Sequence, residues 1–146
     1  MSRGRGRALA LGLLIELVVF VVSLPGFGIE TRSFTQYASW AGPIFLGLTL
    51  VIFASGLAGI GWSGRRPRAA AYLAIVMGVA SIATTVFDDS HLGGPPPPMG
   101  PYLLGFVSIA VAIGLFALAG LLLRALSRPP TPPVAWEPTR PEGGAP

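Results

Sequence analysis

The sequence predicts an all-α membrane protein, a bundle of four transmembrane helices whose two termini both lie in the cytoplasm. Of its 146 residues, 52% are hydrophobic and only 11% are charged, which is far more apolar than a soluble domain of this size. Four apolar runs of 17 to 23 residues are each long enough to cross a bilayer. Arginines flank these runs on alternate connections, as expected where basic residues stay on the cytoplasmic side.

The first predicted span covers residues 8–24 and follows an arginine- and glycine-rich segment, residues 1–7. Glycines between the arginines oppose helix formation, so we expect residues 1–7 to be flexible and cytoplasmic. Pro25 and Gly26 end the span where a membrane helix should end. A cleaved signal peptide is the alternative, because a basic segment before an apolar run is its signature. The absence of an A-x-A cleavage site and the presence of Glu16 inside the run favour a retained span.

The first outer loop carries a helix signal just before the second span. The segment SFTQ at residues 33–36 matches a capping box, and aromatic residues recur there every three positions. These aromatic residues are Phe34, Tyr37 and Trp40. Because amphipathic rings favour the membrane interface, we predict a short interfacial helix over residues 33–41. The alternatives are an irregular loop anchored by the same rings and an aromatic lid over a ligand.

The second and third predicted spans cover residues 43–62 and 69–87, and the short segment SGRRPR joins them. A connection of this length makes the two spans an antiparallel hairpin. Its three arginines place the turn in the cytoplasm. We interpret Arg65 and Arg66 as a topology signal, with binding of anionic lipid head groups as the alternative.

Small residues recur in the second, third and fourth spans at helical spacing, and we predict that they face other helices. Small side chains let helices approach closely, whereas the larger leucine, isoleucine, valine and phenylalanine side chains should face lipid. The small residues concerned are Ser55 and Gly59, then Ala70, Ala74 and Gly78, and finally Gly105, Ala110, Gly114, Ala117 and Gly120.

The fourth predicted span covers residues 101–123 and completes a membrane domain over residues 8–126. It opens with a proline, which is tolerated in the first turn of a helix, and two arginines follow it. The last 18 residues contain seven prolines, a composition that cannot bury a core. We therefore predict a disordered cytoplasmic tail over residues 127–146.

Residue counts exclude several chemistries. The absence of cysteine removes disulfides, iron–sulfur clusters and thiol redox chemistry, and a single histidine cannot supply two haem ligands. Asp88, Asp89 and His91 in the second outer loop are adjacent groups without the geometry of a zinc or calcium site. No helix carries a basic stripe that could follow phosphates. We therefore predict no cofactor, no metal site, no catalytic residues and no nucleic-acid partner, and we do not expect an enzyme.

Glu16 is the one charged residue inside a predicted span and lies at its midpoint. A charge at that depth costs about 3 kcal/mol, and no span contains a basic residue to pair with it. We therefore expect a protonated carboxyl group that forms hydrogen bonds between helices. At about 1.5 Å per residue, Ser55 and Ser81 lie within about 5 Å of the same depth, and Thr49 lies slightly farther. Ser55 and Ser81 are the predicted partners, and Gly12, one turn from Glu16, should let a neighbouring helix approach.

These features favour a small multi-pass protein of the cell membrane that serves as a structural or accessory subunit of a membrane complex. Its partners would be the lipid bilayer and either another membrane protein or further copies of itself. The alternative is a small proton-coupled transporter in which Glu16 exchanges a proton with a substrate. In layout, with four short spans and a membrane glutamate in the first, the chain resembles the small multidrug resistance transporters. The resemblance is confined to this architecture, because the aromatic pocket around the glutamate is not recognisable and the outer loops are longer.

The distribution of arginines predicts the outcome of cysteine labelling in intact cells. Nine arginines fall on the predicted inner side and Arg32 alone falls on the outer side. A cysteine placed at Ser2, Ser63 or Thr131 should be protected from an impermeant thiol reagent, whereas one at Ser90 should react. Labelling that puts Ser2 and Thr131 on opposite sides would contradict the four-span topology.

Overall fold

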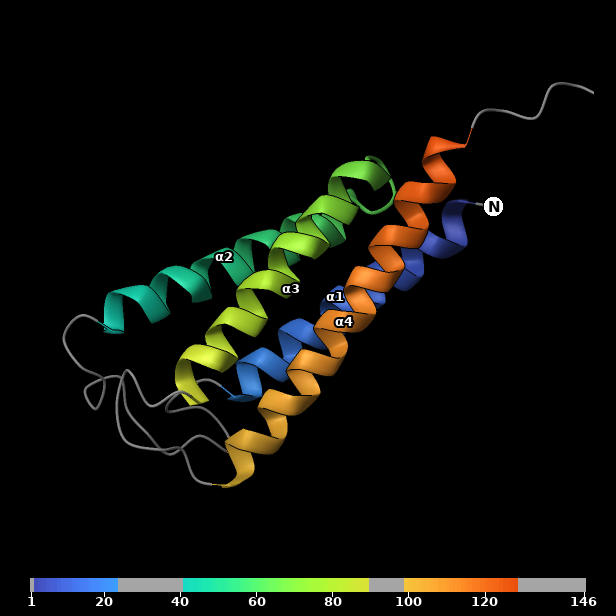
Figure 1. Ribbon diagram of the computed structural model, residues 1–146. Helices are drawn as coiled ribbons and strands as arrows, with labels where there is room; N and C mark the ends of the chain where they lie inside the picture. The colour runs from blue at the N-terminus through green and yellow to red at the C-terminus, as the bar shows by residue number, and fades with distance from the viewer. Residues whose placement is uncertain (1, 24–40, 90–98, 129–146) are drawn as a thin grey trace, which may run out of the picture.

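The computed structural model describes residues 2–23, 41–89 and 99–128, and within these ranges the chain is helical apart from short connections. It contains four helices: α1 (Ser2–Ser23), α2 (Ala41–Trp62), α3 (Pro67–Asp89) and α4 (Met99–Ser127). Each of these helices is long and apolar enough to cross a membrane. The prediction of an all-α chain with four candidate membrane spans is therefore confirmed for the described residues (Figure 1).

The four helices form a bundle in which consecutive helices run in opposite directions (Figure 1). α3 packs on α2 and α4, and α1 also packs on α2 and α4. α1 and α3 lie diagonally across the bundle and share few direct contacts. A side chain that links α1 to α3 must therefore reach across the interior.

The α2–α3 turn, the start of α1 and the end of α4 meet at one end of the bundle (Figure 1). The amides of Arg65 and Arg66 donate to the carbonyl oxygen of Trp62, at 3.1 and 2.8 Å, and close α2. Arg68 at the start of α3 donates to the carbonyl oxygen of Leu126 near the end of α4, at 2.9 Å. All the arginines of the described residues lie in these three segments or, in the case of Arg68, at the start of α3: Arg3, Arg5, Arg7, Arg65, Arg66, Arg68, Arg124 and Arg128.

The arginine- and glycine-rich N-terminal segment is helical, contrary to the prediction of a flexible segment. α1 begins at Ser2 and continues through Gly4 and Gly6. A Cβ atom at Gly6 would lie 2.8 Å from the carbonyl oxygen of Ser63, so a residue without a side chain is needed where α1 passes the turn. Packing against this turn outweighs the low helix propensity of glycine, which costs about 1 kcal/mol per residue relative to alanine.

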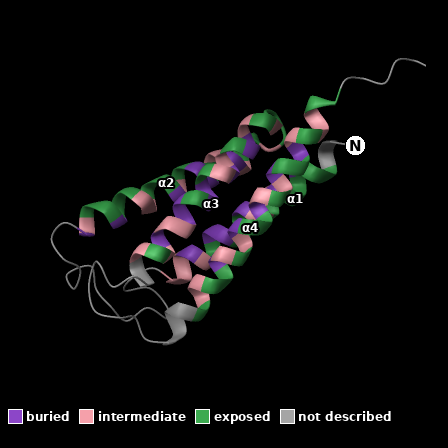
Figure 2. Ribbon diagram, viewed as in Figure 1, coloured by how far each residue is buried: buried purple, intermediate pink, exposed green. Residues whose placement is uncertain are grey.

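α1 has both buried and exposed residues along its length (Figure 2), and its large buried apolar residues recur at a spacing of three or four. These residues are Leu9, Leu13, Leu17 and Phe20. Leu13 packs against Gly59 and Leu17 against Gly56, where added Cβ atoms would lie 2.8 and 3.0 Å from leucine methyl carbons. The two glycines of α2 thus form the surface on which α1 packs, as expected for helices that approach closely in a membrane.

The predicted packing role of the small residues is confirmed for α2 and α3. Ser55 and Gly59 of α2 are buried, and the ridge of α3 formed by Ala70, Ala74 and Gly78 is buried as well. A Cβ atom at Gly78 would lie 2.7 Å from the ring of Phe116 on α4. Within this ridge, Gly78 is therefore the residue that faces a large side chain of the fourth helix.

The same prediction is wrong for α4, because the small residues that it names mostly point outward, whereas Ala112 and Ala119 are the alanines that α4 buries. Gly105 is half-buried, and the exposed residues are Ala110, Gly114, Ala117 and Gly120. The reason is complementarity between neighbours. α4 contributes the large side chains, Phe116 against Gly78 and Leu115 against Gly12, and its neighbours contribute the glycines. One small partner at each contact is sufficient for close packing.

Some predicted features lie outside the described residues. They include the interfacial helix over residues 33–41, apart from Ala41 at the start of α2, and most of the tail over residues 127–146. His91 also lies outside these ranges, and Asp88 and Asp89 are the last residues of α3.

We expect Gly78→Leu to lower the melting temperature of the protein in detergent. The first side-chain atom would already overlap the Phe116 ring, so the ring would have to leave its place or α3 and α4 would have to separate, and either change costs packing energy. Gly114→Leu is the matched control, because a Cβ atom at Gly114 meets nothing within 4 Å. The control should melt at or above the wild-type temperature, since leucine favours a helix over glycine by about 1 kcal/mol. Equal losses in both variants would show that α4 is oriented differently.

Candidate functional site

Glu16 lies on the buried face of α1 and has no exposed surface. It stands three positions after Leu13 and four before Phe20, so helical periodicity places all three side chains on the same side of α1. The apolar residues that anchor α1 to the bundle therefore also carry the carboxyl group into the interior. Turning Glu16 out of the bundle would expose its apolar neighbours.

Two serine hydroxyls from different helices reach the same carboxyl oxygen of Glu16. Ser108 on α4 lies 2.6 Å from Oε1, within hydrogen-bond distance, and Ser81 on α3 is hydrogen-bonded to the same atom. The two serine Oγ atoms are themselves 2.8 Å apart. All three residues are buried, so the three oxygens form a closed triangle that joins α1, α3 and α4.

Of the two partners predicted from the sequence, the structure brings Ser81 to Glu16 and places Ser55 in a different role. Ser55 is buried, but its hydroxyl donates to the carbonyl oxygens of Val51 and Ile52 in its own helix, at 2.6 and 3.3 Å. Thr49 likewise bonds the carbonyl one turn earlier, at 2.8 Å. Such back-bonding is the usual arrangement for hydroxyl side chains in membrane helices.

Ser108 is the partner that the sequence reasoning missed. From the middle of its predicted span it lies about 6 Å toward the outer side, farther than either Ser55 or Ser81. Ser81 lies about 4.5 Å toward the same side, so the two serines differ in depth by only about 1.5 Å. Comparing the depths of the serines with each other, instead of comparing each depth with that of Glu16, indicates that Ser81 and Ser108 can meet.

The number of hydrogens in the triangle favours a protonated Glu16. Three oxygen contacts at hydrogen-bond distance need three hydrogens, whereas two serine hydroxyls supply only two. A proton on Oε1 supplies the third, and the three bonds then run in one direction around the ring. An ionised carboxylate would leave the contact between Ser81 and Ser108 without a hydrogen and would add a buried charge at a cost of about 3 kcal/mol.

The second carboxyl oxygen, Oε2, is buried and has no hydrogen-bond partner among the described residues. With the proton on Oε1, this atom is a carbonyl acceptor, and unfilled carbonyl acceptors are tolerated better than unfilled donors. Moving the proton to Oε2 would instead bury an unpaired O–H group. The cluster can therefore hold one proton and accept one further hydrogen bond. Within the described ranges, no group of three side chains is placed to hold a metal ion.

Comparison of the chain with known protein families, with curated proteins and with solved structures gave no match. The features of the molecule that bear on its function are therefore the cluster formed by Glu16, Ser81 and Ser108 and the distribution of charge over the bundle.

Proposed function

We propose that this chain is a structural or accessory subunit of a membrane complex in which Glu16 is a neutral hydrogen-bonded link between helices. The observation that carries the proposal is the complete burial of Glu16 and its bonding to two buried serines. A residue that exchanges protons with a substrate needs a route to water or to that substrate. Glu16 is 0% exposed in this arrangement, which favours a structural role over a carrier role.

The strength of these bonds suits a link that fixes helix packing. A hydrogen bond between membrane helices contributes about 0.6 kcal/mol on average and at most about 1.7 kcal/mol. Oε1 of Glu16 joins α1 to α4 through Ser108 and to α3 through Ser81. Because α1 and α3 share few other contacts, the bond to Ser81 has a large share in setting their relative position.

The proposed location is the cell membrane, with both termini in the cytoplasm. The gathering of the described arginines at one end of the bundle supports this orientation. The interfacial helix proposed for residues 33–41 would then lie at the outer surface. α4 presents Ala110 and Gly114 outward, four positions apart, a spacing that lets a helix of a partner or of a second copy approach.

A small proton-coupled transporter is the second candidate, and one observation favours it. Oε2 of Glu16 is buried without a partner among the described residues, so the carboxyl group retains a free acceptor that a substrate or a water molecule can use. In that case the bundle must open to expose Glu16, and proton release must accompany opening.

Substitutions at Glu16 distinguish the two functions. Glu16→Gln keeps the shape and a hydrogen-bond donor, so an accessory subunit should keep its free energy of unfolding to within a few tenths of a kcal/mol. Glu16→Ala leaves the serines without their shared partner and should cost about 1 kcal/mol or more. Ser108→Ala should cost about 0.6 kcal/mol, and Ser55→Ala is its matched control because Ser55 bonds only within its own helix. Denaturant unfolding in detergent measures all four variants.

Purification from native membranes and transport measurements complete this test. A stoichiometric membrane-protein partner that is retained by Glu16→Gln would support the subunit proposal. Substrate efflux driven by a proton gradient in wild-type vesicles, abolished by Glu16→Gln without loss of stability, would contradict it and establish the transporter.

A further inference from the structure

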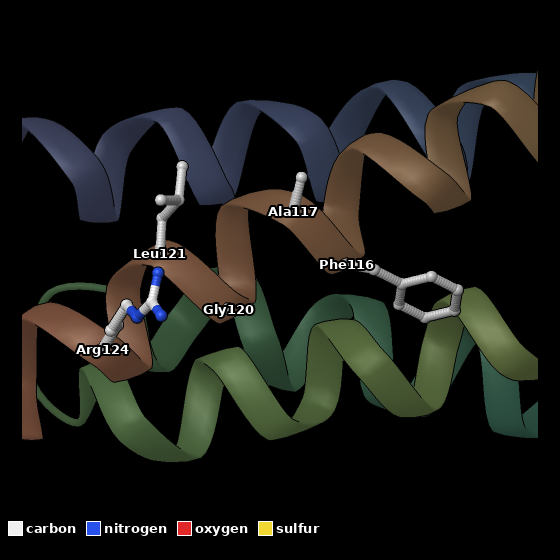
Figure 3. A pocket seen from close by; sticks show the side chains of 5 residues that line it. All are labelled: Phe116, Ala117, Gly120, Leu121 and Arg124. Atoms are coloured by element: carbon white, nitrogen blue, oxygen red, sulfur yellow. The ribbon is translucent and has the colours of Figure 1, made fainter.

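The outward face of α4 carries a hollow near the arginine-rich end of the bundle (Figure 3). The residues that line it are Phe116, Ala117, Gly120, Leu121 and Arg124. Arg124 and Phe116 lie at opposite ends of this row, with Gly120 between them. Ala117 and Gly120 are exposed, and a Cβ atom at Gly120 would meet nothing within 4 Å. The hollow thus opens away from the bundle core, toward the surrounding membrane.

The end of the hollow marked by Arg124 is positively charged. Arg124 and Arg128 are both exposed and one turn apart, and Arg68 reaches the end of α4 through its bond to the carbonyl oxygen of Leu126. The acidic residues of the described ranges lie elsewhere, with Glu16 in the core and Asp88 and Asp89 at the far end of α3. The described part of the chain therefore supplies no carboxylate to neutralise these arginines.

The other end of the hollow is apolar and lies deeper along the helix. Arg124 and Phe116 are eight positions apart, which corresponds to about 12 Å along the axis. Between them, Ala117 and Gly120 leave space that a larger side chain would fill. A ligand that fits must combine an anionic head at the level of Arg124 with an apolar chain that runs toward Phe116.

We propose that this hollow binds an anionic phospholipid, with the head-group phosphate on Arg124 and an acyl chain over Gly120 and Ala117. A free phosphate would use only the charged end. A transmembrane helix of a partner would use the small residues but would leave Arg124 without a counter-charge. An anionic phospholipid satisfies both ends, and arginine near a membrane surface attracts anionic lipid by about fivefold per residue.

The test compares lipid binding by variants of the full-length protein in detergent. Delipidated protein is titrated with phosphatidylglycerol or phosphatidylcholine, and bound lipid is counted by native mass spectrometry. Wild type should prefer phosphatidylglycerol about fivefold or more, and Arg124→Gln should remove most of that preference. Gly120→Leu should weaken binding of phosphatidylglycerol while keeping the fold, because the added side chain points into open space.

Two controls make the test specific to the hollow. Arg65→Gln removes an arginine from the same end of the bundle but from the α2–α3 turn, and Gly47→Leu fills exposed space on α2, away from the hollow. Both controls should bind phosphatidylglycerol like wild type. The proposal fails if Arg65→Gln weakens binding as much as Arg124→Gln, or if Gly120→Leu binds normally. It also fails if inorganic phosphate displaces the lipid, or if Gly120→Leu changes the oligomeric state and leaves lipid binding unchanged.

Discussion

The hydrogen bonds of one buried carboxyl group constrain how the helices of this protein pack. Glu16 lies within an apolar helix face and cannot reach water without exposing Leu13 and Phe20. Its partners must therefore come from other helices, and they do so from α3 and α4. Because the bonds to Ser81 and Ser108 meet at one atom, rotation or sliding of any of the three helices would break at least one of them. A polar group that would otherwise destabilise the bundle instead specifies a single arrangement.

Close approach of the helices is what makes these short side-chain bonds possible. α1 contacts α2 through Gly56 and Gly59 and contacts α4 through its own Gly12, with added Cβ atoms at 3.0 Å or less from leucine methyl carbons. A Cβ atom at Gly12 would meet Leu115 of α4, so α4 approaches α1 closely within one turn of Glu16, the residue that Ser108 contacts. The glycines and the cluster of Glu16, Ser81 and Ser108 thus act together, since wider helix spacing would leave the carboxyl group unbonded.

The helices and the gathering of the described arginines at one end of the bundle could be predicted from the sequence, because both depend on local composition. Apolar length determines which segments span a membrane, and arginines stand at the ends of those segments. The orientation of α4 about its axis could not be predicted. Close packing pairs a large residue on one helix with a small residue on the next, and the sequence does not show which helix supplies the small one. Phe116 on Gly78 is such a contact. The helical start of α1 was missed for a similar reason, since the role of Gly6 depends on the distant Ser63.

The candidate site was predictable in part. Glu16 is conspicuous as a charge within an apolar run, and Ser81 follows from its depth, but depth relative to Glu16 favours Ser55 over Ser108. The choice depends on helix rotation, which directs Ser55 to its own backbone and Ser108 to the carboxyl group. Hydroxyl groups in a helix have a carbonyl available one turn earlier, so a serine in a span indicates a bond between helices only when the fold brings a stronger acceptor to it.

Infrared spectroscopy of the protein in lipid at neutral pH tests most directly whether Glu16 carries the third hydrogen of the triangle. The other acidic residues lie outside the predicted spans, so a protonated carboxyl band at this pH should come from Glu16. The wild type should show this band, Glu16→Gln should lack it, and Ser108→Ala should shift it because one hydrogen bond is lost. A wild-type spectrum without the band would show that Glu16 is ionised, and a neutral link between the helices would then be excluded.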